Sequence, residues 1–188
     1  LLGNASDGAL NKLGTPGAFY ADLAIRILLP GTSGKLASKL MAAGDKLGLT
    51  SKLTKSLNDA AGLAALEAKP VFRKAVNGLT FADVPGIVAK SDGATQYLRS
   101  SVGDDLQARI RPLILSALTK VGAFDQLGKL GKSGGGLLGL VNINNDTLTD
   151  SVTKQALGGI FNYMGKEESG LRGNVLGIGK GLLDTIIK

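Results

Sequence analysis

The chain has 188 residues, of which 44% are hydrophobic and 20% charged, and its formal net charge is +7 at pH 7. This length and composition fit one folded domain and exclude a largely disordered chain. The sequence holds neither cysteine nor histidine, which excludes disulfides, thiolate metal sites, cysteine nucleophiles, and catalysis or metal binding by imidazole.

Residues 1–31 are expected to form an N-terminal helix followed by an extended arm. The segment Ile25 to Leu29 is apolar apart from Arg26. Leu29 precedes Pro30, and a residue before proline favours extended backbone. The arm should therefore be extended.

The arm leads into Gly31 to Lys35, which follows an apolar run as a phosphate-binding loop does. Leu29 stands where that loop needs its first glycine, and Leu36 replaces the serine or threonine that binds Mg²⁺. No nucleotide site is predicted here. Instead, Thr32 or Ser33 should cap a helix that ends near Gly44.

Apolar residues recur every three or four positions from Leu49 to about Asn77, which predicts a long helix with an alanine-rich stripe. Pro70 should bend this helix, because proline removes a backbone hydrogen bond and clashes with the preceding turn. Three further helices should open at the capping-box-like run Thr80–Asp83, at Asp92 and at the acidic pair Asp104–Asp105.

The glycine-rich stretch within residues 128–146 predicts a flexible loop. Its last part, Asn142 to Asp146, is similar to the start of a calcium loop. The glycine and the bidentate acid of that loop are missing, so the pattern predicts helix capping instead. A helix from Thr147 to Gly165 and a last helix from Gly179 to Lys188 complete the chain.

Together these elements predict an all-α fold: residues 1–188 form a single compact domain of about seven to eight helices around one long, Pro-kinked central helix. No apolar run approaches the roughly 18–20 residues that a membrane span requires.

A group of polar residues is the candidate ligand site. Thr95 and Arg99 share a helical face. Asn58 and Lys69 share a face of the long central helix. If these faces meet, they form a cationic, hydrogen-bonding pocket; alternatively, they are polar groups that tie helices together. The candidate ligand-binding residues are Asn58, Lys69, Thr95, Tyr97, Arg99 and Arg109. No catalytic, metal or cofactor site is predicted.

Positive charge is concentrated between Arg26 and Lys55, where only Asp45 is acidic. Such a stretch attracts an anionic membrane surface, although a solvated helical face is the favoured explanation. Nucleic acid is not the expected partner, because these basic residues are not interleaved with aromatic residues that stack on bases.

Several segments in a fixed order resemble a bacterial family designated domain of unknown function 4197. Those that carry the resemblance are Pro16–Phe19, Ile25–Pro30, Leu57–Ala61, Ala68–Phe72, Thr80 with Asp83, Ala94–Leu98, Ile110–Pro112, and Ala156–Phe161 leading to Glu168 and Arg172. Gly62 departs from the family, which tends to have glutamate there. If that glutamate were catalytic, this chain would be inactive.

The resemblance implies an α-helical protein of Gram-negative bacteria, exported to the periplasm or envelope, with no established activity. The chain begins Leu1-Leu2-Gly3, so we expect an export signal to have been removed. The leading functional hypothesis is a non-enzymatic envelope protein that binds a lipidic or other anionic amphiphile. The alternatives are a structural module that binds an envelope protein partner and, more remotely, a carboxylate-based hydrolase or lyase using Asp59, Glu67 or Asp83.

Overall fold

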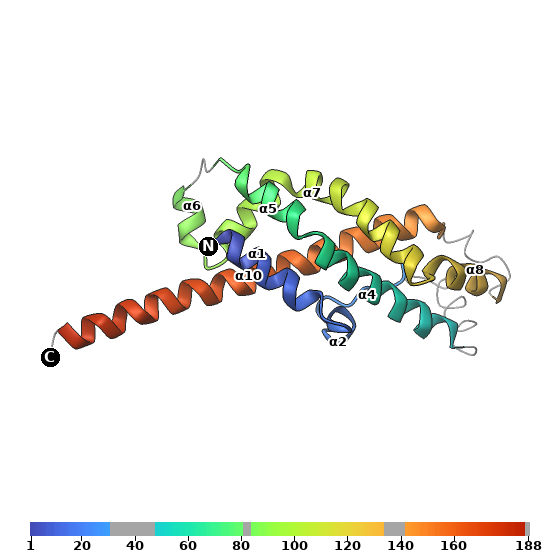
Figure 1. Ribbon diagram of the computed structural model, residues 1–188, viewed down its shortest axis with the longest axis horizontal. Helices are drawn as coiled ribbons and strands as arrows, with labels where there is room; N and C mark the ends of the chain where they lie inside the picture. Colours follow the sequence, from blue (N-terminus) through green and yellow to red (C-terminus); the bar gives the residue numbers. More distant parts are fainter. Residues whose placement is uncertain (31–47, 81–83, 134–141, 187–188) are drawn as a thin grey trace.

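The computed structural model describes residues 1–30, 48–80, 84–133 and 142–186, and within these ranges it confirms an all-α fold with eight helices (Figure 1). The predicted phosphate-loop segment and the helix ending near Gly44 lie outside the described residues. The helices are α1 (Leu2–Leu13), α2 (Ala18–Ala21), α4 (Leu49–Glu67), α5 (Lys69–Asn77), α6 (Val84–Ala89), α7 (Gly93–Lys120), α8 (Ala123–Ser133) and α10 (Asn145–Ile186).

Three long helices, α4, α7 and α10, form the body of the molecule along its longest axis (Figure 1). Their facing sides bury leucine, isoleucine and alanine, because the sequence offers few aromatic residues for a core. Leu57, Ile110 and Ile160 are all at most 1% exposed. None of the helices in the described ranges is long and apolar enough to cross a membrane.

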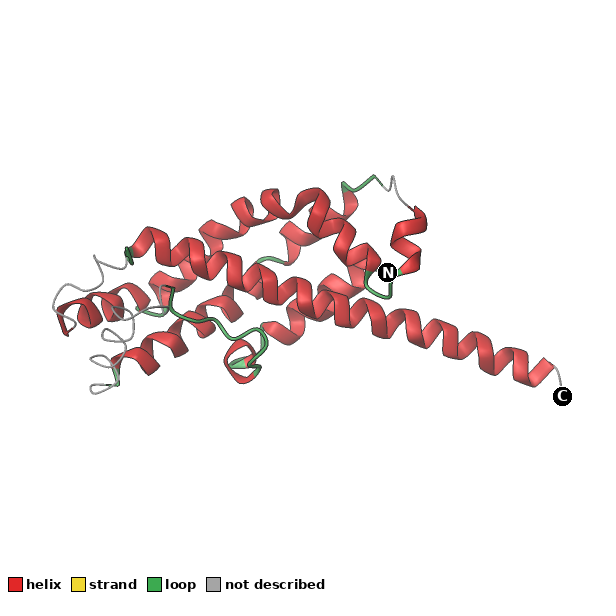
Figure 2. Ribbon diagram, turned by 180° about the vertical axis from the view of Figure 1, so that it is seen from behind, coloured by secondary structure: helices red, strands yellow, loops and turns green. Residues whose placement is uncertain are grey.

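The last helix is longer than the sequence pattern indicated. The two helices expected between Thr147 and Lys188 are one continuous helix, α10. Its C-terminal part projects beyond the other helices (Figure 2). The glycines between the two predicted helices do not end the helix, because glycine lowers helix stability by only about 1 kcal/mol relative to alanine.

A single helix, α7, also replaces the two predicted to open at Asp92 and at Asp104–Asp105. Near the predicted boundary between these two helices, α7 has a kink, since Val102 has non-helical backbone angles (φ −137°, ψ 15°). The central helix is interrupted as Pro70 predicted: α4 ends at Glu67, and Pro70 occupies the first turn of α5. Proline is tolerated there because first-turn N–H groups have no partner within the helix.

The arm passes between α4 and α10, and none of the residues that the structure describes pairs with it as a strand. Asn58 of α4 accepts a hydrogen bond from the Ile27 N–H (2.8 Å) and donates one to the Ile27 carbonyl (2.9 Å). Gln155 of α10 pairs in the same way with Leu28, at 2.9 and 2.8 Å. Gly159 allows the close approach, because a β-carbon there would lie 2.9 Å from the Phe19 ring.

The segment predicted as a flexible loop is partly helical. Residues 128–133 belong to α8, and residues 145–146 begin α10. Asn144 caps α10, because its side-chain oxygen accepts hydrogen bonds from the N–H groups of Asp146 (2.9 Å) and Thr147 (3.0 Å). The helix-capping interpretation of Asn142 to Asp146 is thus confirmed.

Candidate functional site

The start of α7 is held by a buried carboxylate from α10. Glu168 is 0% exposed and accepts hydrogen bonds from the N–H groups of Ala94 (3.0 Å) and Thr95 (2.7 Å). Arg172, one turn further along α10, donates to the same carboxylate at 2.7 and 2.9 Å and to the carbonyl of Ile87 in α6 at 3.2 Å. One ion pair therefore fixes α6, α7 and α10 relative to one another.

The helix opens after Asp92, as predicted, but the Asp92 side chain does not cap it. An N-cap side chain accepts from the second and third helical N–H groups, which here are those of Ala94 and Thr95. Glu168 occupies both, and Asp92 makes no capping bond. Asp92 instead accepts a hydrogen bond from Gln96 at 2.8 Å.

Beside this junction, α7 and α10 enclose an open groove of about 1140 Å³. Polar side chains dominate its lining, and Phe161 supplies an aromatic surface. The lining residues are Ser91, Asp92, Thr95, Gln96, Arg99, Ser100, Gly158, Phe161, Asn162, Gly165, Lys166 and Ser169. A smaller hollow of about 320 Å³ adjoins it and shares Arg99, Gly158 and Phe161.

Two polar groups in the groove lack a partner. Thr95 is 3% exposed, and its hydroxyl oxygen has no hydrogen-bond partner. Arg99 has no carboxylate within ion-pair distance among the residues that the structure describes. Its guanidinium lies 5.6 Å from the centre of the Phe161 ring, which favours a cation above the aromatic face.

The groove is suited to binding an anion. Lys166 adds a second cation, whose nearest carboxylate, Asp22, is 3.8 Å away and outside the groove. Serine, asparagine and glutamine side chains around these cations offer further hydrogen-bond donors. Nothing in the groove resembles an acid–base pair, and the described residues hold no group of three or more acidic side chains that could bind a metal ion.

The structure brings together only part of the predicted ligand site. Thr95 and Arg99 both line the groove. The Asn58 side chain is instead hydrogen-bonded to the backbone of Ile27 in the arm, and Lys69 donates a hydrogen bond to Asn11 of α1.

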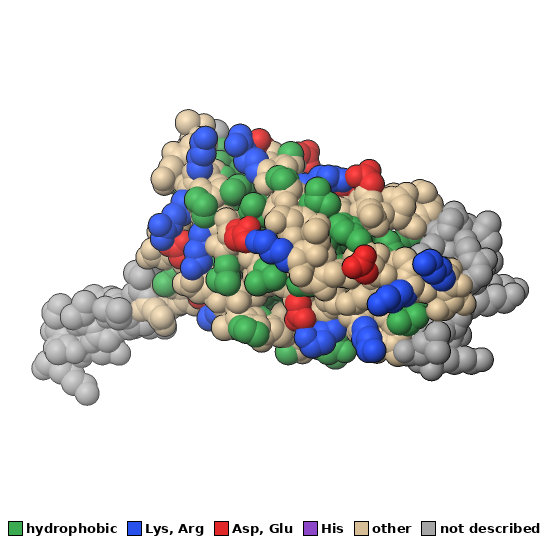
Figure 3. All heavy atoms as spheres, turned by 45° about the vertical axis from the view of Figure 1, so that its right-hand side comes forward, with side chains coloured by type: hydrophobic (Ala, Val, Ile, Leu, Met, Phe, Trp, Pro, Cys, Tyr) green, Lys and Arg blue, Asp and Glu red, His purple; other side chains and the backbone are tan. Residues whose placement is uncertain are grey.

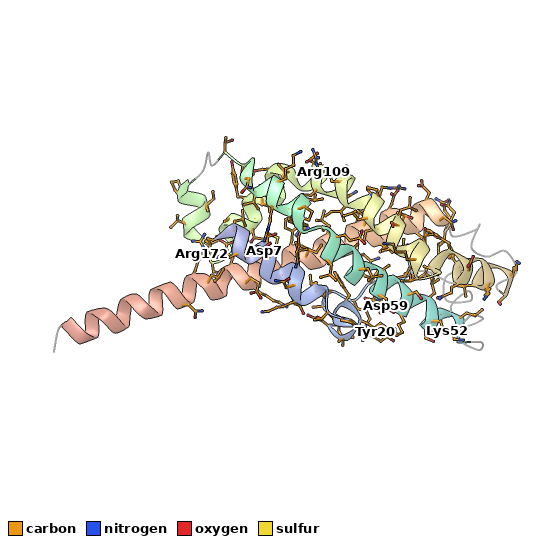
Figure 4. The ribbon with its side chains drawn as sticks, in the orientation of Figure 1. Asp7, Tyr20, Lys52, Asp59, Arg109 and Arg172 are labelled. Atoms are coloured by element: carbon orange, nitrogen blue, oxygen red, sulfur yellow. The ribbon has the colours of Figure 1, made fainter. Side chains whose placement is uncertain are left out.

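The other two predicted residues also lie elsewhere. The Tyr97 hydroxyl donates to the Thr80 carbonyl at 2.7 Å. Arg109 is paired with Asp105 at 2.7 Å on the edge of α7 away from Arg172 (Figure 4). The predicted faces do not form one pocket, because α5, which carries Lys69, packs on α1 and α7, whereas Thr95 and Arg99 line a groove with residues of α10.

Sequence reasoning missed the contribution of α10, namely Phe161, Asn162 and Lys166. The signal available was the helical spacing of Phe161 with Gly158 and Gly165, which places small residues beside an aromatic one. Two of the acids proposed for a hydrolase, Asp59 and Glu67, do not line the groove. Asp59 is paired with Lys55 (2.6 Å), Glu67 is paired with Lys120 (3.2 Å), and residue 83 lies outside the described ranges.

Comparison with known proteins gives one match. A family model described as "Protein of unknown function (DUF4197)" matches residues 1–187. No curated protein and no solved structure matches the chain.

Proposed function

The chain belongs to the DUF4197 family, whose description names no activity, and we propose that it is a non-enzymatic protein of the bacterial envelope whose α7–α10 groove binds an anionic amphiphile. The negatively charged head of the ligand contacts Arg99, Thr95 and Lys166. The apolar part lies along Phe161, whose ring lines both the groove and the adjoining hollow.

The unpaired hydroxyl of Thr95 is the observation that carries this proposal. A buried polar group without a partner costs about 1–3 kcal/mol. An oxyanion bound in the groove can accept a hydrogen bond from this hydroxyl and remove that cost. Arg99 can donate two parallel hydrogen bonds to the same carboxylate or phosphate, which is the favoured geometry for a guanidinium.

The test measures binding of dodecyl phosphate by isothermal titration calorimetry. Arg99→Ala should weaken binding at least about tenfold, because it removes a charge-assisted contact of about 1.5–3 kcal/mol. The matched control is Arg109→Ala, which removes an exposed arginine that pairs with Asp105 within the same helix. Equal affinities for Arg99→Ala and the wild type would place the ligand elsewhere.

A second variant separates a binding role for Thr95 from a structural one. Thr95→Val replaces the hydroxyl with a methyl group of similar size. Without its unsatisfied hydroxyl, the free protein should unfold at a higher temperature, while dodecyl phosphate binds more weakly. A lower unfolding temperature for this variant would mean that the hydroxyl already has a partner in the free protein.

A structural, partner-binding role is the second candidate, and the length of α10 favours it. The helix continues to Ile186 and projects beyond the body (Figures 1 and 2). The sequence of this part repeats apolar residues at Val175, Ile178, Leu182 and Ile186, a spacing typical of a helix that packs on another. Native mass spectrometry distinguishes the two roles. An extractable amphiphile in stoichiometric amount supports the groove, whereas oligomers without ligand support partner binding.

A further inference from the structure

The arm and α2 present an apolar surface to solvent. Leu23 is 77% exposed and Leu28 is 53% exposed, and Ala21 and Ala24 beside them are also exposed. We call these four residues the arm patch. The residues that alternate with them face inward, since Ile25, Ile27 and Leu29 are all at most 6% exposed. The arm is therefore apolar on both sides.

The arm patch is held rigidly at the surface. The peptide groups of Ile27 and Leu28 are paired with the side-chain amides of Asn58 and Gln155, which belong to two different helices. The backbone of the arm at these positions therefore needs no water as a hydrogen-bond partner. Such a segment can enter an apolar medium without leaving these peptide groups unsatisfied.

The charges around the arm patch leave a positive balance. Asp22, the acid within the arm, accepts hydrogen bonds from Ala24 and Tyr163 and lies 3.8 Å from Lys166. Asp59 of α4 is paired with Lys55 at 2.6 Å. Both acids thus already have partners.

Two further cations near the arm have no acidic partner among the described residues. Arg26 lies over the Tyr20 ring at 4.4 Å and donates to the Tyr20 carbonyl at 2.6 Å. Lys52 lies at the start of α4, on the same edge of the molecule as Tyr20 and Asp59 (Figure 4). On the face of the molecule shown in the space-filling view, basic and acidic side chains both lie among hydrophobic ones (Figure 3).

We propose that the arm patch docks on an anionic lipid surface, with Leu23 and Leu28 entering the headgroup region. Apolar side chains bordered by cations are the combination that binds such a surface. The hydrophobic part supplies the affinity and the cations supply the preference for anionic lipid. This site is distinct from the α7–α10 groove, although Lys166 borders both.

The absence of tryptophan from the chain permits a direct test with Leu23→Trp, whose single indole reports its surroundings. With vesicles of phosphatidylcholine and phosphatidylglycerol, its emission should shift to shorter wavelength, as in an apolar environment. Val88→Trp is the matched control, because Val88 is 63% exposed on α6. Its emission should not shift. Equal emission of Leu23→Trp with and without vesicles overturns the proposal.

Cosedimentation with the same vesicles measures the affinity. Leu23→Ser with Leu28→Ser should weaken it at least about tenfold, since each leucine loses most of its hydrophobic transfer free energy. Binding should also fall as salt rises to about 0.15 M, where the Debye length is about 8 Å. Binding that survives the double substitution, or that is equal on pure phosphatidylcholine, overturns the proposal.

Two variants distinguish failure of this proposal from failure of the proposed amphiphile binding in the α7–α10 groove. Arg99→Ala should leave vesicle binding unchanged, and the double serine variant should bind dodecyl phosphate with wild-type affinity. A protein whose vesicle binding is lost in Arg99→Ala would bind lipid through the groove, and the arm patch would then not be the docking surface.

Discussion

Glu168 and Arg172 form an ion pair whose carboxylate has no contact with solvent. Moving a charge out of water is costly, and the cost is offset only when the charge is fully paired and hydrogen-bonded. Glu168 meets this condition with two backbone N–H groups and the guanidinium of Arg172. The carboxylate also lies at the positive end of the α7 dipole, which favours a negative charge.

Glu168→Ala should therefore lower the free energy of unfolding by about 1–3 kcal/mol for each of the two buried N–H groups that it leaves without an acceptor, and it also removes the counter-ion of the partly buried Arg172. Glu168→Gln should cost less, about 1–3 kcal/mol, since one oxygen remains to accept a backbone hydrogen bond. Urea denaturation followed by circular dichroism measures both. Glu167→Gln is the control, because Glu167 is 22% exposed and pairs with the exposed Lys12. If Glu167→Gln and Glu168→Gln cost the same, the buried pair is not what holds α7.

Sequence reasoning placed the start of α7 correctly but did not identify the side chain that caps it. Asp92 is the residue type that caps helices, and it stands at the right position. Glu168, which provides the cap, is 74 positions away from Ala94 along the chain. A local pattern cannot reveal such a partner, because only the packing of α10 on α7 brings it there. For the same reason, Thr95 and Arg99 could be singled out from sequence, but the sequence did not show that Phe161 and Lys166 of α10 line the same groove.

At the scale of elements, the arm shows how an extended segment is stabilised without a sheet. Every buried peptide group needs a hydrogen-bond partner. The proline at position 30 predicted the extended backbone, but nothing nearby in the sequence supplied the partners. Asn58 and Gln155 do so from α4 and α10, so the arm depends on the distance between these two helices.

Trypsin should detect the loss of either amide. The bond after Arg26 lies within the arm, and cleavage there requires the arm to leave the body. Asn58→Ala or Gln155→Ala leaves an N–H and a carbonyl unpaired, at about 1–3 kcal/mol for each buried group. Cleavage after Arg26 should become at least about tenfold faster in each variant.

The control for general destabilisation is Ile114→Val, a core change on α7 expected to cost about 0.5–1.5 kcal/mol. This variant should raise the rate of trypsin cleavage at all sites together, as expected when the whole molecule unfolds. Asn58→Ala and Gln155→Ala should instead raise cleavage after Arg26 before other sites. Cleavage that rises equally after Arg26 and after Arg109 in the amide variants would show that the amides stabilise the whole fold rather than the arm.

At the scale of the whole molecule, ion pairs link helices that are far apart in sequence. Asp7 of α1 binds Arg73 of α5 at 2.8 Å. Arg111 of α7 binds Asp150 of α10 at 2.6 Å. Each pair is partly exposed, so each contributes modestly, about 0–1 kcal/mol. Their common effect is that stability depends on pH, because the carboxylates must stay ionised.

The pKa of Asp7 is lowered from 3.8, mainly by its hydrogen bond with Arg73; burial opposes this effect, and the charges of Arg73 and Lys69 add to the lowering. A carboxyl whose pKa is lower in the folded state stabilises the fold at any pH above its unfolded value. This stabilisation is lost as the pH falls from 3.8 through the lowered value. The pKa of Asp22 is likewise lowered, mainly by the Ala24 N–H and the Tyr163 hydroxyl, and its effect is lost in the same acidic range.

Asp7→Asn should therefore unfold at a lower temperature than the wild type at pH 7, by no more than a few degrees, since about 1 kcal/mol shifts the midpoint of a domain of this size by about 2–4 °C. As the pH falls below 3.8, the two midpoints should converge, because the wild-type carboxyl then becomes neutral too. Calorimetric scans from neutral to acidic pH measure this difference. Asp105→Asn, which removes an ion pair within α7 alone, is the control for charge without a link between helices. The difference in unfolding temperature between Asp7→Asn and the wild type could instead stay constant down to the lowest pH. That result would show that the Asp7 side chain acts through packing rather than through its charge.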